Sequence, residues 1–334
     1  MRLTPDRLFR PGIGYTPRTM LRAVPYLLAW FVFLIGVVAM AARFVPVINH
    51  GVLFLSAFAP YLAVGGAAAS GFVLLVLKRP GWAVVPLALA VAAVAVQVPL
   101  FTSAKPDAGP TVRVLTVNAM EGAADPAVLA GTARERADLL AVQELTTELA
   151  DALSDRLAPD FPFRALNPGR SAIGTGIWSR YPIASSRPIP GYRLGATSAT
   201  VRIPGAASDA VVLCVHLVGP WPYPIDGWRR ELARLPQSLD EAARAAGSGA
   251  VIVAGDFNAT RDMAPYRRLL RGGYQDAVDQ SGSGLTPTYP ADRRIPPLLG
   301  IDHILTRNSS ASGVHTVAIP GTDHLGMAAS IHLR

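Results

Sequence analysis

Residues 251–260 read Val-Ile-Val-Ala-Gly-Asp-Phe-Asn-Ala-Thr, a short apolar run that ends in Gly255, Asp256 and Asn258. Such a run before a glycine is typical of a strand that is buried on both faces. Polar residues at the end of a buried strand are held at the rim of a rigid sheet, where proteins commonly present binding and catalytic groups. This stretch therefore predicts a buried sheet with a carboxylate and an amide at one edge.

The same arrangement recurs throughout residues 111–334. The β-rich runs are 112–117 before Asn118, 139–142 before Glu144, 176–178 before Ser179, 211–215 before His216, 251–253 before Asp256, 301–305 around Asp302, and 326–332 after Asp323 and His324. Helical patterns lie between them at roughly 125–137, 146–157, 227–246 and 262–271. Alternating strands and helices predict an α/β domain over residues 111–334.

Taken singly, these polar residues have ordinary structural explanations. Asn118 suits a turn, Glu144 suits the start of a helix, and His216 suits a hydrogen-bonded position at a strand edge. Asp256 and Asn258 suit an Asx turn before a helix. Their repeated placement at the ends of buried strands instead favours one site for metal or phosphate chemistry.

Seven blocks of this region resemble, in order, the endonuclease/exonuclease/phosphatase family, also called the DNase I-like family. The blocks lie at 114–118, 138–144, 176–183, 215–217, 255–258, 300–305 and 322–324. The resemblance covers 111–334 and implies an α/β four-layer sandwich, in which two mixed sheets are flanked by helices. It also implies a metal-dependent phosphoric ester hydrolase.

The resemblance assigns a divalent ion, Mg²⁺ with Mn²⁺ as the alternative, to Glu144, with Asn118 and Asp323 nearby. Mg²⁺ prefers oxygen ligands, keeps several waters, and is commonly held by one or two carboxylates together with substrate phosphate. The residue types at these positions agree with that chemistry.

The resemblance also implies catalytic roles at five positions. Asp256 and Asn258 match the pair that positions and activates the attacking water. His324 matches the histidine that contacts the phosphate, and Asp302 matches its carboxylate partner, which would fix the imidazole tautomer. His216 matches a second histidine, a phosphate ligand or an acid for the leaving oxygen.

The first 101 residues predict a membrane anchor. Uncharged apolar runs indicate three transmembrane helices at about 23–42, 52–77 and 82–101, since about 20 such residues cross a bilayer. A cleaved signal peptide is the alternative for the first run, although it leaves the other two unexplained. Residues 102–110 are polar, contain Pro and Gly, and predict a short linker.

The distribution of charge predicts the topology. Five arginines precede the first run, and Lys78 and Arg79 lie between the second and third. The positive-inside rule places the N-terminus in the cytoplasm of a plasma-membrane protein, so that the domain after three spans is extracytoplasmic. The membrane bilayer is thus an expected partner, whereas no motif indicates a protein partner.

The formal charge of +8 also bears on the substrate. Residues 1–105 carry nine basic residues and one acidic residue, so residues 106–334 are neutral, with 22 of each sign. A neutral domain argues against nucleic acid. The chain also resembles, less specifically, actinobacterial membrane proteins of the VanJ type, which are linked to teicoplanin resistance. That likeness implies a lipid-linked phosphate or pyrophosphate substrate, such as an undecaprenyl derivative, and a role in the cell envelope and in glycopeptide antibiotic resistance.

Three alternatives stay open from the sequence. One is an extracytoplasmic nuclease, which predicts arginines clustered around Glu144. Another is a sphingomyelinase-like lipid phosphodiesterase. The third is a membrane scaffold without activity, which would need no metal ion.

Overall fold

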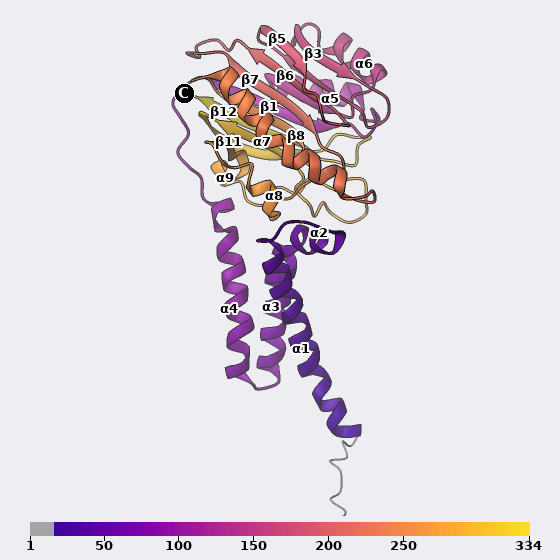
Figure 1. The fold of residues 1–334 in the computed structure, drawn as a ribbon, viewed down its shortest axis with the longest axis vertical. Coiled ribbons are helices and arrows are strands. Elements are labelled where there is room, and N and C mark those ends of the chain that lie inside the picture. Colours follow the sequence, from indigo (N-terminus) through magenta and orange to yellow (C-terminus); the bar gives the residue numbers. More distant parts are fainter. Residues whose placement is uncertain (1–16) are drawn as a thin grey trace, which may run out of the picture.

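The computed structural model describes residues 17–334, and side chains from residue 23 onward. Three helices form a stem beneath a larger domain (Figure 1). They are α1 (Pro17–Ala42), α3 (Ala59–Val76) and α4 (Pro80–Gln97), the last continued by a 3-10 turn, η1 (Val98–Phe101). All three are long and apolar enough to cross a membrane, within Ala23–Ala42, Ala59–Val76 and Pro80–Phe101.

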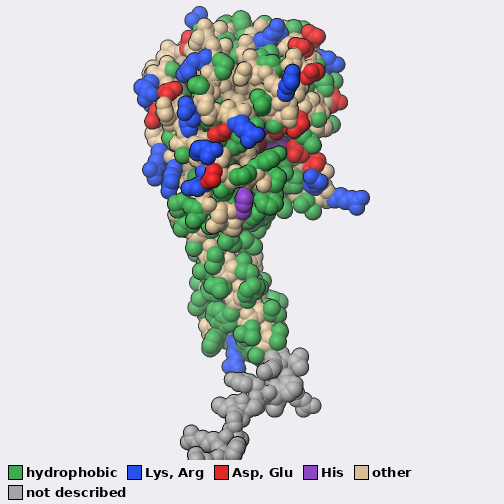
Figure 2. Space-filling model, turned by 45° about the vertical axis from the view of Figure 1, so that its right-hand side comes forward, with side chains coloured by type: hydrophobic (Ala, Val, Ile, Leu, Met, Phe, Trp, Pro, Cys, Tyr) green, Lys and Arg blue, Asp and Glu red, His purple; other side chains and the backbone are tan. Residues whose placement is uncertain are grey.

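The stem exposes its apolar side chains instead of burying them. Leu27, Phe31, Phe72, Trp82 and Val91 are all at least 60% exposed. Figure 2 shows this continuous apolar surface, with charged side chains gathered on the domain and Lys or Arg at the far end of the stem. An apolar outer surface is what a helix facing lipid requires, because lipid offers no partner for polar groups.

The second span differs from the prediction of 52–77. The chain forms a separate short helix, α2 (His50–Ala57), and the long apolar helix α3 begins only at Ala59. Asn49 caps α2 by accepting a hydrogen bond from Val52 N at 2.9 Å, and Pro60 stands at the start of α3. A side-chain cap and a proline at N1 or N2 both favour a helix start, which explains the break at Phe58. In Figure 1, α2 lies across the top of the stem, below the domain.

The domain contains two mixed six-stranded sheets. The first has the order β11 (Ser309–Val317), β12 (Gly326–Leu333), β1 (Thr111–Asn118), β2 (Leu139–Gln143), β4 (Gly174–Ser179), β3 (Phe163–Pro168). The second has the order β5 (Ile183–Pro188), β6 (Ala196–Val201), β7 (Ala210–His216), β8 (Val251–Asp256), β10 (Asp302–Arg307), β9 (Gln275–Asp276). Each sheet has one parallel pair at its centre, β1 with β2 and β7 with β8.

Helices cover the outer faces of both sheets, which gives the expected four-layer sandwich. The helices are α5 (Pro126–Arg136) and α6 (Thr147–Leu157) on the first sheet, α7 (Asp226–Ala246) and α8 (Ala264–Arg267) on the second, and α9 (Ala277–Ser281) beside β9 and β11. The inner faces of the two sheets bury a common core that includes Val114, Ile177, Val212 and Ile304. Only four residues of the helix expected at 262–271 are α-helical, and they begin beside Pro265.

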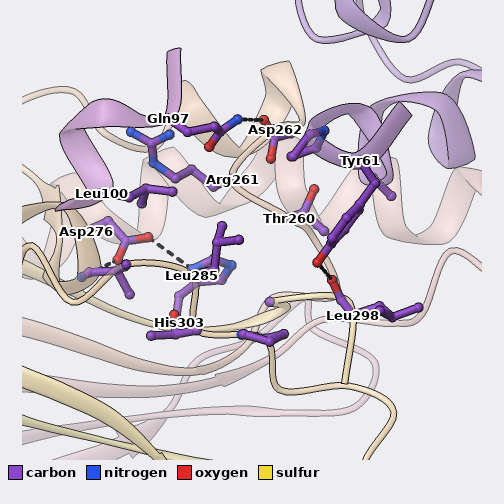
Figure 3. Close-up of a pocket in the computed structure, with 17 residues that line it drawn as sticks. Tyr61, Gln97, Leu100, Thr260, Arg261, Asp262, Asp276, Leu285, Leu298 and His303 are labelled. Atoms are coloured by element: carbon purple, nitrogen blue, oxygen red, sulfur yellow. Dashed lines mark hydrogen bonds and ion pairs between the residues drawn. The ribbon is translucent and has the colours of Figure 1, made fainter. Parts of the chain in front are cut away.

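The stem and the domain are packed together. Val47, Leu53 and Ala57 lie in the same buried cluster as Trp228 of α7. Arg43 forms an ion pair with Asp262. A cavity of about 70 Å³ lies at this junction, between Tyr61 and Gln97 of the stem and the loop around Thr260 (Figure 3).

The expected linker 102–110 is bound to the domain along its length. Ala104 N donates to Gln280 O at 2.9 Å, and Asp107 N donates to Ser310 Oγ at 2.7 Å. The Asp107 side chain also pairs with Arg334 at 3.2 Å. The segment is therefore an extended strap and holds the domain at a fixed distance from α4.

Candidate active site

Strand register brings three of the predicted residues together in the second sheet. His216 is opposite Asp256 in the parallel pair β7 and β8, and Asp256 is opposite Asp302 in the antiparallel pair β8 and β10. Neighbouring strands lie about 4.8 Å apart, so these side chains form one row at the sheet edge. All three are at most 2% exposed.

Asn118 joins this row to the first sheet. It ends β1, and Glu144 follows β2, the neighbouring parallel strand. The Asn118 Nδ2 amide donates to Glu144 Oε1 and to Asp256 Oδ2, both at 3.1 Å. One buried amide therefore bridges carboxylates that come from opposite sheets.

Two of the site residues have a left-handed backbone, Glu144 with φ +55° and Asn258 with φ +48°. Asn adopts this conformation readily, whereas for a glutamate it costs about 1–2 kcal/mol. Glu144 Oε2 accepts a hydrogen bond from Glu121 N at 2.6 Å, which contributes to holding the turn. Backbone strain of this kind is concentrated at functional sites, where it aims a side chain.

Asn258 is fixed between Asp256 and the loop after β7. Its backbone N donates to Asp256 Oδ1 at 2.7 Å, and its Nδ2 donates to Asp256 Oδ2 at 3.1 Å. The same Nδ2 donates to Leu217 O at 2.9 Å. The predicted pair therefore acts as one rigid unit.

His324 lies between two carboxylates. Its Nδ1 is 2.8 Å from Asp302 Oδ2, and its Nε2 is 3.9 Å from Asp256 Oδ2. Burial opposes protonation of this imidazole, but the Asp302 and Asp256 charges outweigh it and raise the pKa of His324 to about 10. The predicted Asp302–His324 partnership is thus present as a charge-assisted hydrogen bond.

The pKa values of His216 and Asp256 are displaced in opposite directions, and only that of Asp256 lies near neutral pH, where proton transfer is efficient. Burial, with the nearby His324 charge, lowers the pKa of His216 to about 3, so this imidazole is neutral at pH 7. Its Nε2 lies 3.6 Å from Asp256 Oδ2 and 3.8 Å from Glu144 Oε1. Burial, followed by the Asp302 charge, raises the pKa of Asp256 to about 7.

The carboxylates fit a divalent cation. Asp256, Asp302 and His324 offer ligand atoms within 4.8 Å of one another, and Asp302 Oδ1 is buried without a hydrogen-bond partner among the described residues. Burial also raises the pKa of Glu144, and the hydrogen bonds from Asn118 and from Glu121 N only partly offset this cost. A cation bound by oxygen ligands would remove these costs.

This compact group differs from the predicted metal set of Glu144, Asn118 and Asp323. Because His324 is protonated between its two carboxylates, it carries no free lone pair for a cation while that ion pair persists. Glu144 and Asn118 are in contact, whereas the Asp323 carboxylate makes no hydrogen bond within the described residues and acts through its charge on Glu144, His324 and Tyr289. The position of the ion among these groups stays a prediction.

Three further residues lie at the site that were not assigned to it from the sequence. The Tyr289 ring lies 5.0 Å from the His324 ring. Thr322 Oγ1 donates to Asn118 O at 2.7 Å, and Thr288 Oγ1 lies 3.4 Å from Asp302 N. Thr322 occurs in the block 322–324 of the family resemblance, whereas Thr288 and Tyr289 lie outside the seven blocks.

A groove of about 1090 Å³ adjoins the site and gathers four exposed arginines: Arg170, Arg193, Arg230 and Arg234. None of the four forms an ion pair within the described part of the chain. Its lining also includes Glu121, which holds Glu144, and Val218, two residues after His216. The lining also contains Asp226, which pairs with Arg229, and Glu231, so its four arginines exceed its acidic residues by one.

Comparison with solved structures gives the same architecture. Humanized D. rerio TDP2 is 19% identical with a TM-score of 0.56, and the match covers 66% of this chain and 99% of that one. An endonuclease/exonuclease/phosphatase from Bacteroides vulgatus is 17% identical with a TM-score of 0.54, and the match covers 67% and 100%. D. rerio TDP2 complexed with a single-strand DNA product is 17% identical with a TM-score of 0.53, covering 68% and 100%. These identities establish the fold alone.

No curated protein matches the sequence. The family model for the endonuclease/exonuclease/phosphatase family matches residues 115–324, which is more than half of the chain. That segment includes every predicted site residue and the whole second sheet, whereas β12 of the first sheet lies beyond it. The chain therefore belongs to the endonuclease/exonuclease/phosphatase family and is a metal-dependent phosphoester hydrolase.

Proposed function

We propose that the protein is anchored in the plasma membrane and hydrolyses a phosphate ester or pyrophosphate borne by a lipid, such as an undecaprenyl derivative. The observation that carries this proposal is the docking of the active-site loops on the stem. Tyr61 OH of α3 donates to Leu298 O at 2.7 Å, and Gln97 Nε2 of α4 donates to Asp262 Oδ1 at 3.3 Å. The His50 imidazole of α2 lies 3.0 Å from Pro220 O.

Each of these contacts reaches a different loop beside the site. Leu298 is in the loop before Asp302, Asp262 follows Asn258, and Pro220 follows His216. Helices that cross the membrane would thus hold the rim of the site near the lipid headgroups. A substrate attached to the same membrane would need to travel only within it.

The chemistry that we infer uses the site as described. When bound, the divalent ion would neutralise charge on the phosphoryl oxygens, and Glu144 and Asn118 are the residues proposed to hold it. Asp256, whose pKa is close to neutral, accepts a proton from the attacking water that Asn258 helps to orient. The water oxygen bonds to phosphorus as the bond to the leaving oxygen breaks.

The two histidines have different tasks in this scheme. Charged His324, held by Asp302, donates a hydrogen bond to a phosphoryl oxygen and stabilises the negative charge of the transition state. Neutral His216 lies beside Asp256 and contacts the phosphate or a water. Leaving-group protonation would then come from the surrounding solvent or from His324.

The arginine groove supports an anionic substrate, and it also favours a second candidate function. Four unpaired arginines beside the site suit a pyrophosphate or a phosphorylated headgroup, but they suit a single nucleic acid strand as well. A D. rerio TDP2 structure of the same fold is described with a single-strand DNA product. A nuclease is therefore the alternative, and a sphingomyelinase-like diesterase is tested beside it.

The proposed topology has a cytoplasmic N-terminus and an extracytoplasmic catalytic domain. The arginine-rich N-terminal segment lies outside the described residues except for its last members, and Lys78 and Arg79 lie at the turn between α3 and α4. A VanJ-like role in glycopeptide resistance is part of the same proposal. A reporter fused after Arg334 tests the topology, since activity only in the cytoplasm would reverse it.

The function is tested with the full chain in detergent or nanodiscs. Phosphate release from undecaprenyl pyrophosphate is measured with and without Mg²⁺, beside single-stranded DNA and sphingomyelin. His324→Ala should abolish release, whereas His315→Ala, at an exposed histidine of β11, should not. Cleavage of DNA or sphingomyelin in place of the pyrophosphate would keep the chemistry and reject the substrate. No cleavage of any of them would favour the scaffold.

A further inference from the structure

An uncharged surface segment lies between the first two spans. The spans end at Ala42 and begin again at Ala59, so the residues between them are close to the membrane boundary. Residues 44–58 contain no Asp, Glu, Lys or Arg and include α2. The loop 219–225, Gly-Pro-Trp-Pro-Tyr-Pro-Ile, is also uncharged. We call these two segments together the interfacial shelf.

The first segment of the shelf has two different faces. Val47, Leu53 and Ala57 are buried against the domain, in the cluster that includes Trp228. In contrast, Phe44, Val45, Ile48 and Phe54 are exposed, at 66%, 44%, 57% and 42%. One face of this segment packs against the domain, and the other exposes apolar side chains to the surroundings. Such an exposed apolar face is stabilised when a second apolar environment covers it.

The loop adds two exposed aromatic rings to that face. Trp221 is 58% exposed and Tyr223 is 66% exposed. The Trp221 ring lies 5.3 Å from the His50 ring and 5.4 Å from the Phe54 ring. His50 Nε2 also lies 3.0 Å from Pro220 O and 3.2 Å from Tyr223 O, so α2 fixes the loop at both sides of Trp221.

We propose that the interfacial shelf is embedded in the boundary between lipid headgroups and acyl chains, with the Trp221 and Tyr223 side chains in contact with lipid. Trp and Tyr favour this zone because each has an apolar ring and a polar group that stays hydrated. The absence of charge across the shelf and its position between two spans select the bilayer as the occupant. The proposal rests on the membrane anchoring proposed above, but not on the identity of the substrate.

The shelf also connects the bilayer to the catalytic residues. Leu217, two residues before the loop, accepts a hydrogen bond from Asn258 through its carbonyl oxygen. Tyr223 lines the arginine groove at the other end of the loop. A phosphate attached to a lipid at the shelf would therefore lie beside the arginine groove.

Spin labels on the full chain in liposomes test the proposal. Trp221→Cys and Tyr223→Cys are labelled separately, and Ser186→Cys on exposed β5, far from the stem in Figure 1, is the matched control. The native Cys214 is fully buried, so it does not compete for the label. The accessibility of each label to oxygen and to a water-soluble nickel chelate is measured.

The labels at 221 and 223 should be more accessible to oxygen, which dissolves in lipid, and less accessible to the nickel chelate, which stays in water, than the label at 186. Equal accessibility at all three positions would overturn the proposal, whatever substrate the enzyme cleaves. Broadening between labels at 221 would identify a second copy of the chain as the occupant and would also overturn it. If Trp221→Cys disturbs the contact with His50, the label at 223 still decides the question.

Discussion

Asn118 is the residue through which the two sheets meet at the site, and its replacement by aspartate makes a quantitative prediction. The substitution keeps the side-chain shape but removes the amide that donates to both Glu144 and Asp256 at 3.1 Å. Three carboxyl groups would then face one another in a buried position. At an effective dielectric constant of 20, two ionised carboxylates about 3.1 Å apart repel each other by about 5 kcal/mol. One of the carboxylates will therefore bind a proton, because its neutral form avoids this repulsion.

The cost of that proton depends on pH. Holding one extra carboxyl neutral, with an ordinary pKa of about 3.9, costs about 4 kcal/mol at pH 7 and about 1.5 kcal/mol at pH 5. A protonated carboxyl retains one of the two hydrogen bonds, and loss of the other adds about 1.5–3 kcal/mol. The introduced group has a folded pKa above its unfolded value, so its penalty grows as pH rises above about 4. Asn118→Asp should therefore lower the stability by about 6 kcal/mol at pH 7 and by about 4 kcal/mol at pH 5.

The assay is thermal unfolding of the full chain in detergent, at both pH values and with and without Mg²⁺. For a domain of this size, a loss of 6 kcal/mol corresponds to a decrease in Tm of about 12–24 °C. A cation satisfies the three carboxylates without a proton, so Mg²⁺ should raise the Tm of the variant more than that of the native chain. Asn167→Asp on β3 is the control. An equal loss at both pH values, with no greater response to Mg²⁺, would refute the electrostatic reasoning.

Three further predictions concern separate parts of the molecule. His216→Ala removes a neutral hydrogen-bonding contact to the phosphate and should lower kcat about 100-fold or more, yet leave the pH profile between 5 and 8 unchanged in shape because the pKa of His216 is about 3; a shift of the profile would show that His216 titrates there. Cys214, with its pKa raised by burial to about 12, should react with a maleimide at pH 8 only on unfolding, so rapid labelling of folded protein would contradict its burial. Tyr61→Phe removes the hydrogen bond to Leu298 O and should lower stability by about 1 kcal/mol; the Tm measures this loss, and an unchanged Tm would mean that the contact contributes nothing.

Much of the site could be predicted because its residues follow buried strands. The run 251–256 ends in Asp256, and Asn118, Glu144 and His216 follow similar apolar runs, so sequence pattern alone places them at strand ends. Parallel pairing of β1 with β2 and of β7 with β8 then places those ends at the same edges. The family resemblance supplied what the pattern lacks, namely that both edges face the same site.

Other features have no such local signal. The strand β5 reads Ile-Ala-Ser-Ser-Arg-Pro and is almost entirely exposed, so it lacks the apolar run that marks β7 and β8 in the same sheet. The apolar run 52–77 is continuous in sequence, and only the cap at Asn49 and the placement of Pro60 divide it into α2 and α3. The contact of Tyr289 with His324 depends on the path of a long loop. Each of these is decided by tertiary packing and not by the period of hydrophobic residues.

The strap formed by residues 102–110 has a consequence for kinetics. Hydrogen bonds to Gln280 and Ser310 fix this segment to the domain. The contacts of Arg43, Tyr61 and Gln97 with the domain oppose a change in its tilt relative to the stem. If the substrate is borne by a lipid, as proposed above, a catalytic centre held at one height above the membrane encounters it in two dimensions. Its rate would then vary with the mole fraction of substrate in the lipid surface, and dilution of the vesicles in buffer would leave it unchanged.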